Sequence, residues 1–584
     1  MERPPAPPPE PSEGLPPPPD ARMGETWRLD PDPVAIVPGA AQGSLATAGA
    51  GSRRSVRRVA TIVGAAVLVV ALAGGAAAYL LLRGSTADLL ARVPADVEMA
   101  AVVHLDPAAG QKVNLARLSE AFPGLRDDGG WQARRDELLD EALEGTGLRS
   151  ADLLEWLGVE LAVAVDVVDD EPHTALLADV DDHDALQRTL AKLATPGSPW
   201  EGVDFDERTY EGVTIAQAPD TSSIGALAYA IDGDVFVVAS DGGLVERIVD
   251  TAKGDRQALP ANPAFVDAEA DLPDGRLALL YLDAAGLFDA IAQIAGTDPS
   301  LGGVGGFGDP AAVRGMAMSI SAEETGIAFD MNAVYDPAKV TGALRDQLTA
   351  PDLGPEVVAM VPPDAYGLFA VPHVDTGLRS IDEDLRELDQ GFADELQRMG
   401  ITGSTGFLSH VQGDFVVEVG PDPGTAVGGA VLVEVDAGGE DALDLMMRLL
   451  VPDPAGWTTR SHDGLDVTTM QGELPLSYAV HDGTAIIGSS GEQVRRVVDV
   501  ARSGGGIDTA PAFERGMQGM PATDGLLFVD VGGVVRAIRD SLPAEERATF
   551  DEELGADLRA VRSVAMGLDA DERHQRARVF IAIG

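Results

Sequence analysis

Residues 59–82 form an uncharged apolar run of 24 residues, and this run divides the chain into two parts. A helix needs about 20 apolar residues to cross the hydrocarbon core of a bilayer, so the run is long enough to span it. Four arginines lie within residues 53–58, whereas Arg83 is the only charged residue directly after the run. Because an excess of arginine marks the cytoplasmic flank, we expect residues 1–58 inside the cell and the C-terminal body outside the membrane.

A cleaved signal peptide is the alternative to a membrane anchor. Such peptides have a short basic leader and an apolar region of about 7–15 residues. Here more than 50 residues precede the apolar run, and the run continues past the small residues at 76–78. The sequence therefore predicts an uncleaved signal anchor that places the protein in the cell membrane as a single-pass protein.

The leader itself is rich in proline, with ten prolines in residues 1–20. Proline has no backbone N–H and cannot form helix or sheet hydrogen bonds, so residues 1–58 are expected to be a disordered cytoplasmic segment. It is either a solvated spacer or a Pro-rich ligand for a cytoplasmic partner, and the spacer explains the composition more simply.

The charge balance excludes several kinds of partner and chemistry. The chain has 95 acidic and 42 basic residues, a net charge of −53, and only seven of the acidic residues precede residue 63. Nucleic acids and anionic lipids are bound through lysine and arginine, so no nucleic acid partner is expected for the acidic body.

The chain has no cysteine. Disulfides, thiolate nucleophiles, iron–sulfur clusters and cysteine zinc sites are therefore excluded.

The body after the membrane carries an internal duplication. Five short motifs recur in the same order: residues 91–96 as 359–364, 229–233 as 478–483, 263–265 as 511–513, 281–286 as 528–533, and 312–318 as 560–566. Chance is a poor explanation for five collinear matches. The sequence therefore predicts two homologous tandem units, residues 86–350 and 355–584.

Each unit alternates pairs of short apolar strands with helices. The clearest hairpin is 227–231 with 235–239, because the Asp232-Gly233 pair between them favours a two-residue turn. Helix 244–252 has an apolar stripe, and a further helix is expected from Ser380, with Glu383 completing a capping box. The other expected strands are 97–105, 160–167, 174–180, 315–321, 326–334 and 365–371, and the other expected helices are 184–193 and 337–348. This order indicates an α+β fold, with antiparallel sheets covered on one side by helices.

The pattern resembles a known family. A single apolar run is followed by Leu89-x-x-x-Val-Pro-Ala-Asp96 before the first strand, the hairpins contain glycine and tyrosine, and residues 263–265 open a helix as Pro-Ala-Phe. These features resemble the bacterial proteins catalogued as domain of unknown function 3352, over most of residues 86–584. The resemblance implies a membrane-anchored envelope protein, and it supplies no activity and no catalytic residues.

The best candidates for chemistry are two His-x-Asp motifs, one at the end of the first strand of each unit. His104 with Asp106 and His373 with Asp375 each share one strand face, since residues two apart on a strand point the same way. Histidine beside a carboxylate can ligate a metal or move protons. However, no third ligand recurs at matching spacing in both units. Hydrogen bonds at strand ends explain the motifs better, so no catalytic residue, cofactor or metal site is assigned.

Other polar residues also have a structural explanation. Asp283 and Asp530 follow matching apolar strands, and paired carboxylates can perform acid–base chemistry when the fold brings them together, but helix N-capping explains both. Similarly, Asp182 or His183 is expected to open helix 184–193 rather than to bind Ca²⁺. Structural roles are also expected for Tyr229 and Tyr478 at a sheet margin, Ser490 at a helix start with Gln493 as its capping-box partner, and the glycine-rich loop 302–308.

The sequence thus favours a non-enzymatic binding or scaffolding module of the bacterial envelope, anchored through residues 59–82. Two alternatives stay open: an exported carrier of an apolar ligand held between sheet and helices, and an exported metal-dependent hydrolase that uses one of the His-x-Asp motifs. The sequence names neither the partner nor the ligand.

Overall fold

The computed structural model describes residues 88–122, 136–284, 312–378 and 390–584, apart from gaps of one to five residues inside these ranges. All described residues belong to one compact unit. The apolar run, the glycine-rich loop and the predicted helix start at Ser380 lie outside the described residues. Within the described part, no helix is both long enough and apolar enough to cross a membrane.

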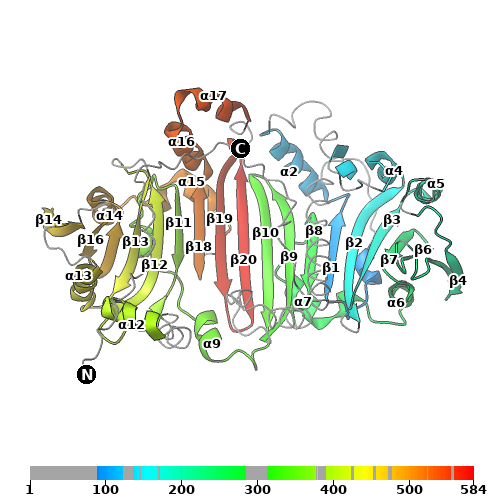
Figure 1. The fold of residues 1–584 in the computed structure, drawn as a ribbon, viewed down its shortest axis with the longest axis horizontal. Helices are drawn as coiled ribbons and strands as arrows, with labels where there is room; N and C mark the ends of the chain where they lie inside the picture. Colours follow the sequence, from blue (N-terminus) through cyan, green and yellow to red (C-terminus); the bar gives the residue numbers. More distant parts are fainter. Residues whose placement is uncertain are drawn as a thin grey trace, which may run out of the picture. The chain divides into compact units, whose positions relative to one another are not determined.

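The described residues form an α+β fold built on one antiparallel sheet of 20 strands (Figure 1). The first ten strands pair in the order β4-β5-β6-β7-β3-β2-β1-β8-β9-β10, and every pair is antiparallel. Their bounds are β1 Met99–His104, β2 Leu157–Val168, β3 Glu171–Val180, β4 Asp206–Tyr210, β5 Val213–Gln217, β6 Ala228–Asp232, β7 Val235–Ala239, β8 Ala278–Leu282, β9 Val313–Glu323 and β10 Gly326–Tyr335.

The remaining strands pair in the order β14-β15-β16-β17-β13-β12-β11-β18-β19-β20, again antiparallel throughout. This order is the same as that of the first ten strands, with ten added to each strand number. β10 pairs with β20 over nine residue pairs, and the two strands lie side by side in Figure 1. The bounds are β11 Gly367–Val371, β12 Val411–Gly420, β13 Gly428–Val435, β14 Trp457–His462, β15 Leu465–Met470, β16 Leu476–His481, β17 Thr484–Gly488, β18 Gly525–Asp530, β19 Val561–Ala570 and β20 His574–Ile583.

Helices accompany both sets of strands. In the first set they are α2 Ala109–Ser119, α4 Ser150–Leu154, α5 His183–Leu193, α6 Gly242–Lys253, α7 Pro263–Glu269 and α9 Gly342–Leu348, with 3₁₀ helices η1 Leu89–Arg92 and η3 Leu259–Ala261. In the second set they are α10 Pro355–Val358, α12 Gln390–Arg398, α13 Gly439–Leu450, α14 Gly491–Ser503, α15 Pro511–Gly516, α16 Val531–Ser541 and α17 Ala544–Glu553, with η7 Phe407–His410 and η9 Ile507–Thr509.

The helices do not cover one side only, as the sequence suggested. Alternate residues of β1 enter two different cores: Ala100 and Val102 pack with α6 and α7, whereas Met99 and Ala101 pack with α5 on the opposite face. The second half repeats this arrangement, with α14 and α15 on one face and α13 on the other. The expectation of one covered side was wrong, because both faces of these strands are apolar and both are covered by helices. A short apolar run does not distinguish a strand buried on one face from a strand buried on both.

The local predictions agree well with the structure. The hairpin of β6 and β7 turns at Gly233, whose φ of 60° is in the left-handed region that favours glycine. Asp182 caps α5 by accepting the N–H of Ala185 at 2.9 Å, as predicted. In contrast, the helix expected over 337–348 begins only at Gly342. The Asp336 carboxylate accepts the N–H of Ala338 and forms a turn that replaces the first helical residues.

Candidate functional site

His104 and Asp106 have different partners in the structure. His104 lies at the end of β1, and its Nδ1 is 2.9 Å from Oε1 of the buried Glu160 on β2. The other oxygen of Glu160 accepts the backbone N–H of Leu89 at 3.0 Å. Asp106 forms an ion pair with the ammonium group of Lys112. In this half, histidine and Glu160 together hold the first described segment against the sheet.

His373 and Asp375 lie closer to one another, with His373 Nδ1 3.7 Å from Asp375 Oδ1. This separation is within ion-pair range but too long for a hydrogen bond. The backbone N–H of His373 points to the buried Asp414, whose second oxygen accepts the N–H of Gly354 at 2.6 Å. Asp414 therefore ties down the opening segment of the second half, as Glu160 does in the first. Asp375 also lines a cavity of about 490 Å³.

The aspartate of the repeated Val-Pro-x-Asp motif also has matching partners in the two halves. Asp96 Oδ1 accepts a hydrogen bond from Arg247 of α6 at 2.9 Å, and Asp364 pairs with Arg496 of α14. Burial alone would raise the pKa of Asp96, but the ion pairs with Arg247 and Arg256 and a backbone hydrogen bond together hold this pKa below its usual range. Arg247 also pairs with the buried Asp166. These groups join the segment before the first strand of each half to a helix.

Asp530 stands at the N-cap position of α16, as predicted for it, but its side chain makes no capping hydrogen bond and lies 3.5 Å from Arg536 instead. Ser490 caps α14 by accepting the N–H of Gln493 at 3.1 Å. In a full capping box the Gln493 side chain would also bond to the backbone N–H of Ser490. Instead, the fully buried Gln493 side chain donates a hydrogen bond to the carboxylate of Glu418. Tyr478 is buried rather than marginal, and its hydroxyl donates to Asp444 of α13 at 2.7 Å.

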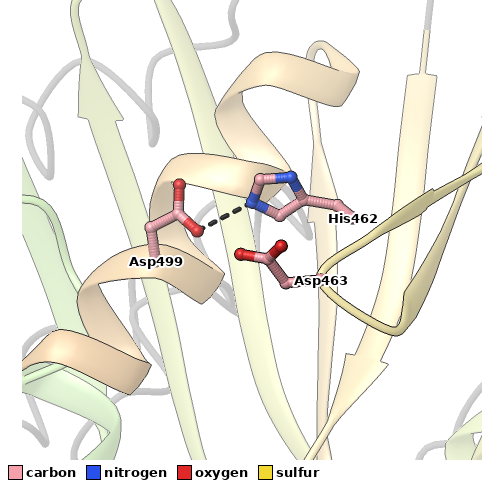
Figure 2. Close-up of side chains that lie close together, drawn as sticks. All are labelled: His462, Asp463 and Asp499. Carbon is pink, nitrogen blue, oxygen red and sulfur yellow. Dashed lines mark hydrogen bonds and ion pairs between the residues drawn. The ribbon is translucent and has the colours of Figure 1, made fainter.

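The described residues contain one group of three side chains with metal-ligand spacing: His462, Asp463 and Asp499, whose ligand atoms all lie within 4.8 Å of one another. Figure 2 shows His462 and Asp463 at the turn between β14 and β15, facing Asp499 of α14. His462 Nε2 is 2.7 Å from Asp499 Oδ1. Imidazole and carboxylates suit several divalent metals. Both carboxylates are exposed, so the group is open to solvent.

The first half has a counterpart of this group that is not a metal site. There the turn between β4 and β5 places Tyr210 against α6, and its hydroxyl donates to Asp250 at 2.9 Å. Both turns carry a non-glycine residue with positive φ followed by glycine, Glu211-Gly212 and Asp463-Gly464. The shared role is to fasten a hairpin tip to a helix. The sequence pattern does not reveal this group, because His462 and Asp499 are 37 positions apart. The available signal is the matching pattern of the two turns.

A continuous row of apolar side chains crosses the middle of the sheet. Directly paired residues put their side chains on the same face, and this row is Val417, Phe369, Leu527, Met566, Val579, Phe329, Ile320 and Ala278, one from each of eight adjacent strands. We call this the central apolar face. Phe369 and its neighbour Val419 are 45% and 44% exposed. At one edge, Leu115 and Leu118 of α2 pack against this face beside Ile320 and Ile327.

The opposite face of the same strands is closed by helices α7 and α15. Phe265 of α7 meets Tyr281 edge to face with ring centroids 5.2 Å apart, and Phe513 of α15 meets Phe528 in the same way at 5.1 Å. The pairs occupy matching places in the two halves. The two faces of the central strands therefore differ, since one is filled by paired aromatic rings and the other leaves large apolar side chains partly exposed.

Comparisons with known proteins identify a family and no activity. Residues 62–583 match the model of a family described as "Protein of unknown function (DUF3352)". No curated protein matches the chain. Among solved structures, crystal form III of TP0453 aligns with 11% identity and a TM-score of 0.23, covering 45% of this chain and 85% of that one. Crystal form IV gives 12% identity and a TM-score of 0.23, covering 43% and 81%. Similarities this slight carry no argument. The match over residues 62–583 places the chain in the DUF3352 family, as its sequence motifs suggested.

Proposed function

We propose that this protein is a single-pass envelope protein whose extracytoplasmic body binds a ligand and performs no catalysis. The leader 1–58 is cytoplasmic, residues 59–82 span the membrane, and only residues 83–87 separate this span from the first described residue. Five extended residues reach less than about 20 Å, so the body stays next to the bilayer. The two units 86–350 and 355–584 are homologous copies, and the repeated strand order supports this assignment.

The observation that carries a binding function is the central apolar face. Soluble proteins rarely leave large contiguous apolar patches exposed, and such patches commonly mark binding sites. Phe369 and Val419 sit next to one another on β11 and β12 and are both nearly half exposed. Because the anchor holds the body at the bilayer, acyl chains of lipids are the most abundant apolar molecules available to the body. The binding function is therefore that of an apolar-ligand carrier, with an acyl chain as the ligand.

The contacts of the two His-x-Asp motifs support a structural role for these histidines and no catalytic one. In both halves the histidine lies beside a buried carboxylate, Glu160 or Asp414, that accepts a backbone N–H from the opening segment. The histidine side chain takes part in this contact only in the first half, where its Nδ1 bonds to Glu160. Replacing His104 by alanine should lower the free energy of unfolding by only about 0.5–1.5 kcal/mol, because it removes one hydrogen bond near the surface. His373→Ala should cost less, because the His373 side chain lies 3.7 Å from Asp375 and forms no hydrogen bond with it. Both changes should leave ligand binding intact.

The decisive test is identification of the bound molecule. Full-length protein is purified from membranes in mild detergent, extracted with organic solvent, and the extract is analysed by mass spectrometry. We expect a lipid at near-stoichiometric amount, and its loss in Phe369→Asp. Val266→Asp is the matched control, because Val266 is 47% exposed on α7, which packs on the opposite face. Absence of lipid from the wild type, or equal lipid in both variants, would disprove the carrier function.

The topology has a separate test. Protease added to intact cells should digest the C-terminal body and spare residues 1–58, because the arginines before the apolar run retain the leader inside. Immunodetection with tags at each end gives the answer. Protection of the C-terminal tag in intact cells, with digestion after lysis, would place the body inside and overturn the proposal.

A further inference from the structure

The two ends of the sheet carry matching edge strands that differ in their charge. The strands β4 and β14 lie at opposite ends of the sheet (Figure 1), and among the described strand pairings each has one neighbour, β5 or β15. An edge strand presents a row of backbone N–H and C=O groups to which another strand can add, and proteins commonly protect such edges with charged side chains. The side chains of the two edges therefore indicate which of them is open to pairing.

Charged residues protect β4 but not β14. Tyr210 and His462 are equivalent, since each ends its strand before the turn and contacts the same helix of its half, so Glu207 of β4 corresponds to Thr459 of β14. The sequence of β4 is Asp-Glu-Arg-Thr-Tyr, whereas β14 reads Trp-Thr-Thr-Arg-Ser-His and has no acidic residue. Residues 458–461 are all exposed. In a chain with a net charge of −53, β14 is thus an edge at which a second acidic molecule meets little repulsion.

The turn after β14 determines which backbone groups of the strand point outward. Both turn residues have positive φ, 49° and 87°, as in a type I′ turn, and His462 lies opposite Leu465. The residues that flank such a turn exchange both of their backbone hydrogen bonds, and bonded and non-bonded pairs alternate along an antiparallel ladder. The N–H and C=O groups of Thr459 and Ser461 therefore point away from β15 and toward the open edge.

Two symmetric registers would pair most of β14 with a second copy of the same strand. One is centred on Arg460 and places its guanidinium group opposite that of the copy, which is unfavourable because the charges are alike. The other is centred on Thr459, whose outward N–H and C=O groups exchange hydrogen bonds with those of the copy. It places Thr458 opposite Arg460 and Trp457 opposite Ser461, so no like charges face one another. The edge is therefore complementary to itself in the register centred on Thr459.

The side chains around Thr459 fit the same register. Thr459 Oγ1 lies 3.1 Å from Thr468 Oγ1 of β15. With Thr459 beside its own copy, the hydroxyls of these two threonines and of the same two threonines of the copy form one row, and cross-strand threonine pairs are stabilising. The acidic residues that follow β14, Asp463 and Asp466, lie toward the turn. Because the turns of two antiparallel strands lie at opposite ends, these carboxylates do not face their copies.

The chain already joins its two sets of strands by pairing of this kind. β10 and β20 hold matching places in the two sets, and they pair edge to edge in the antiparallel direction. We propose that two copies of the protein pair through β14 in an antiparallel dimer whose two-fold axis passes beside Thr459. Such an axis is perpendicular to the sheet, so the central apolar faces of the two copies lie on the same side. The inference goes beyond the proposed acyl-chain site and does not depend on it.

The first test places a thiol at the centre of the proposed interface. The chain has no cysteine, so Thr459→Cys introduces the only one. Full-length protein in mild detergent is treated with a short bismaleimide crosslinker, and a denaturing gel reports any band at twice the monomer mass. We expect a strong dimer band for Thr459→Cys and little for the control Gln187→Cys, because Gln187 is exposed on α5 in the other set of strands.

The crosslinking is repeated in native membranes to identify the occupant of the edge. A dimer band of Thr459→Cys no stronger than that of Gln187→Cys would overturn the proposal. A crosslink from residue 459 to a different polypeptide, in place of the dimer band, would also overturn it and would assign the edge to another protein.

The second test imports the residue of the protected edge. Thr459→Glu, which copies Glu207, places two carboxylates opposite one another and should weaken the dimer at least about tenfold in sedimentation equilibrium of the full-length protein in detergent. Gln187→Glu adds the same charge on α5 and should leave the dissociation constant unchanged. Circular dichroism and thermal melting check the fold of each variant, and the crosslinking test does not depend on Thr459→Glu. A monomeric wild type, or an unchanged dissociation constant for folded Thr459→Glu, would refute the pairing.

Discussion

Glu418 illustrates how a single buried carboxyl can make the stability of this protein depend on pH. It lies on β12 with no exposed surface, and Gln493 donates a hydrogen bond to it. Burial raises its pKa to about 7, and the hydrogen bond from Gln493 and the charge of Arg496 only partly offset this effect. The folded chain therefore keeps a proton on Glu418 under conditions in which the unfolded chain has lost it.

The direction of the pH effect follows from this difference. Between pH 4.5, the ordinary value, and about pH 7, the folded state binds more protons at Glu418, so stability falls as pH rises through this window. Glu418→Gln keeps the partner and cannot ionise, so it should be more stable than wild type by about 2–3 kcal/mol above pH 7 and should approach the wild type below pH 4.5. Denaturant unfolding of both proteins across this range measures the difference. Glu492→Gln, an exposed change on α14, should show no such trend.

Arg247 is the second residue from which we predict a large effect. It is mostly buried and pairs with Asp166, which is 4% exposed, as well as with Asp96. Removing one member of a buried ion pair leaves the other charge without compensation, so Arg247→Met should lower the free energy of unfolding by about 3 kcal/mol. Arg188→Met is the control, because its pair with Glu155 is half exposed and should contribute less than about 1 kcal/mol. Equal effects of the two changes in denaturant unfolding would contradict this assignment.

At the scale of elements, the hairpin of β14 and β15 depends on its contact with α14. His462→Ala removes the bond to Asp499 and should lower the stability of the hairpin by about 1 kcal/mol, seen as faster amide hydrogen exchange over residues 457–470. His462→Tyr should preserve slow exchange, because Tyr210 makes the same contact with Asp250 in the first half. If His462→Ala leaves exchange unchanged, the contact does not hold the hairpin.

The elements also show which features could be predicted from the sequence. Caps, tight turns and strands depend on residues near one another in the chain, so Asp182, Gly233 and Ser490 were placed correctly. The cavity beside His410 is lined by residues from four separate segments of the chain. The positions of these segments relative to one another are set by tertiary packing and not by the local sequence pattern.

At the scale of the whole described body, the two sets of ten strands are joined through one strand pairing. Among the strand pairings of the described residues, only β10 with β20 links one set to the other. The sequence motifs indicated two units, but they did not indicate which strands join them, because that pairing connects residues about 250 positions apart. Ala328, Phe580 and Ala582 form a small buried cluster at this junction. Nine residue pairs and this cluster connect the sets, together with the ion pairs Arg578–Asp330 and Arg576–Asp271 and the peptide chain.

This junction predicts that the halves stay together after the chain between them is cut. A protease site engineered at residues 350–354, followed by cleavage, should leave two fragments that co-elute in size-exclusion chromatography, because the β10–β20 hydrogen bonds and the buried cluster do not involve the cut segment. Ala328→Arg places a charge in the fully buried junction and should separate the cleaved fragments, since an unpaired buried charge is strongly unfavourable. Ala109→Arg, at the exposed start of α2, is the control and should leave them associated. Fragments of the otherwise unchanged protein that separate on cleavage would show that the peptide chain, and not the strand pairing, holds the two halves together.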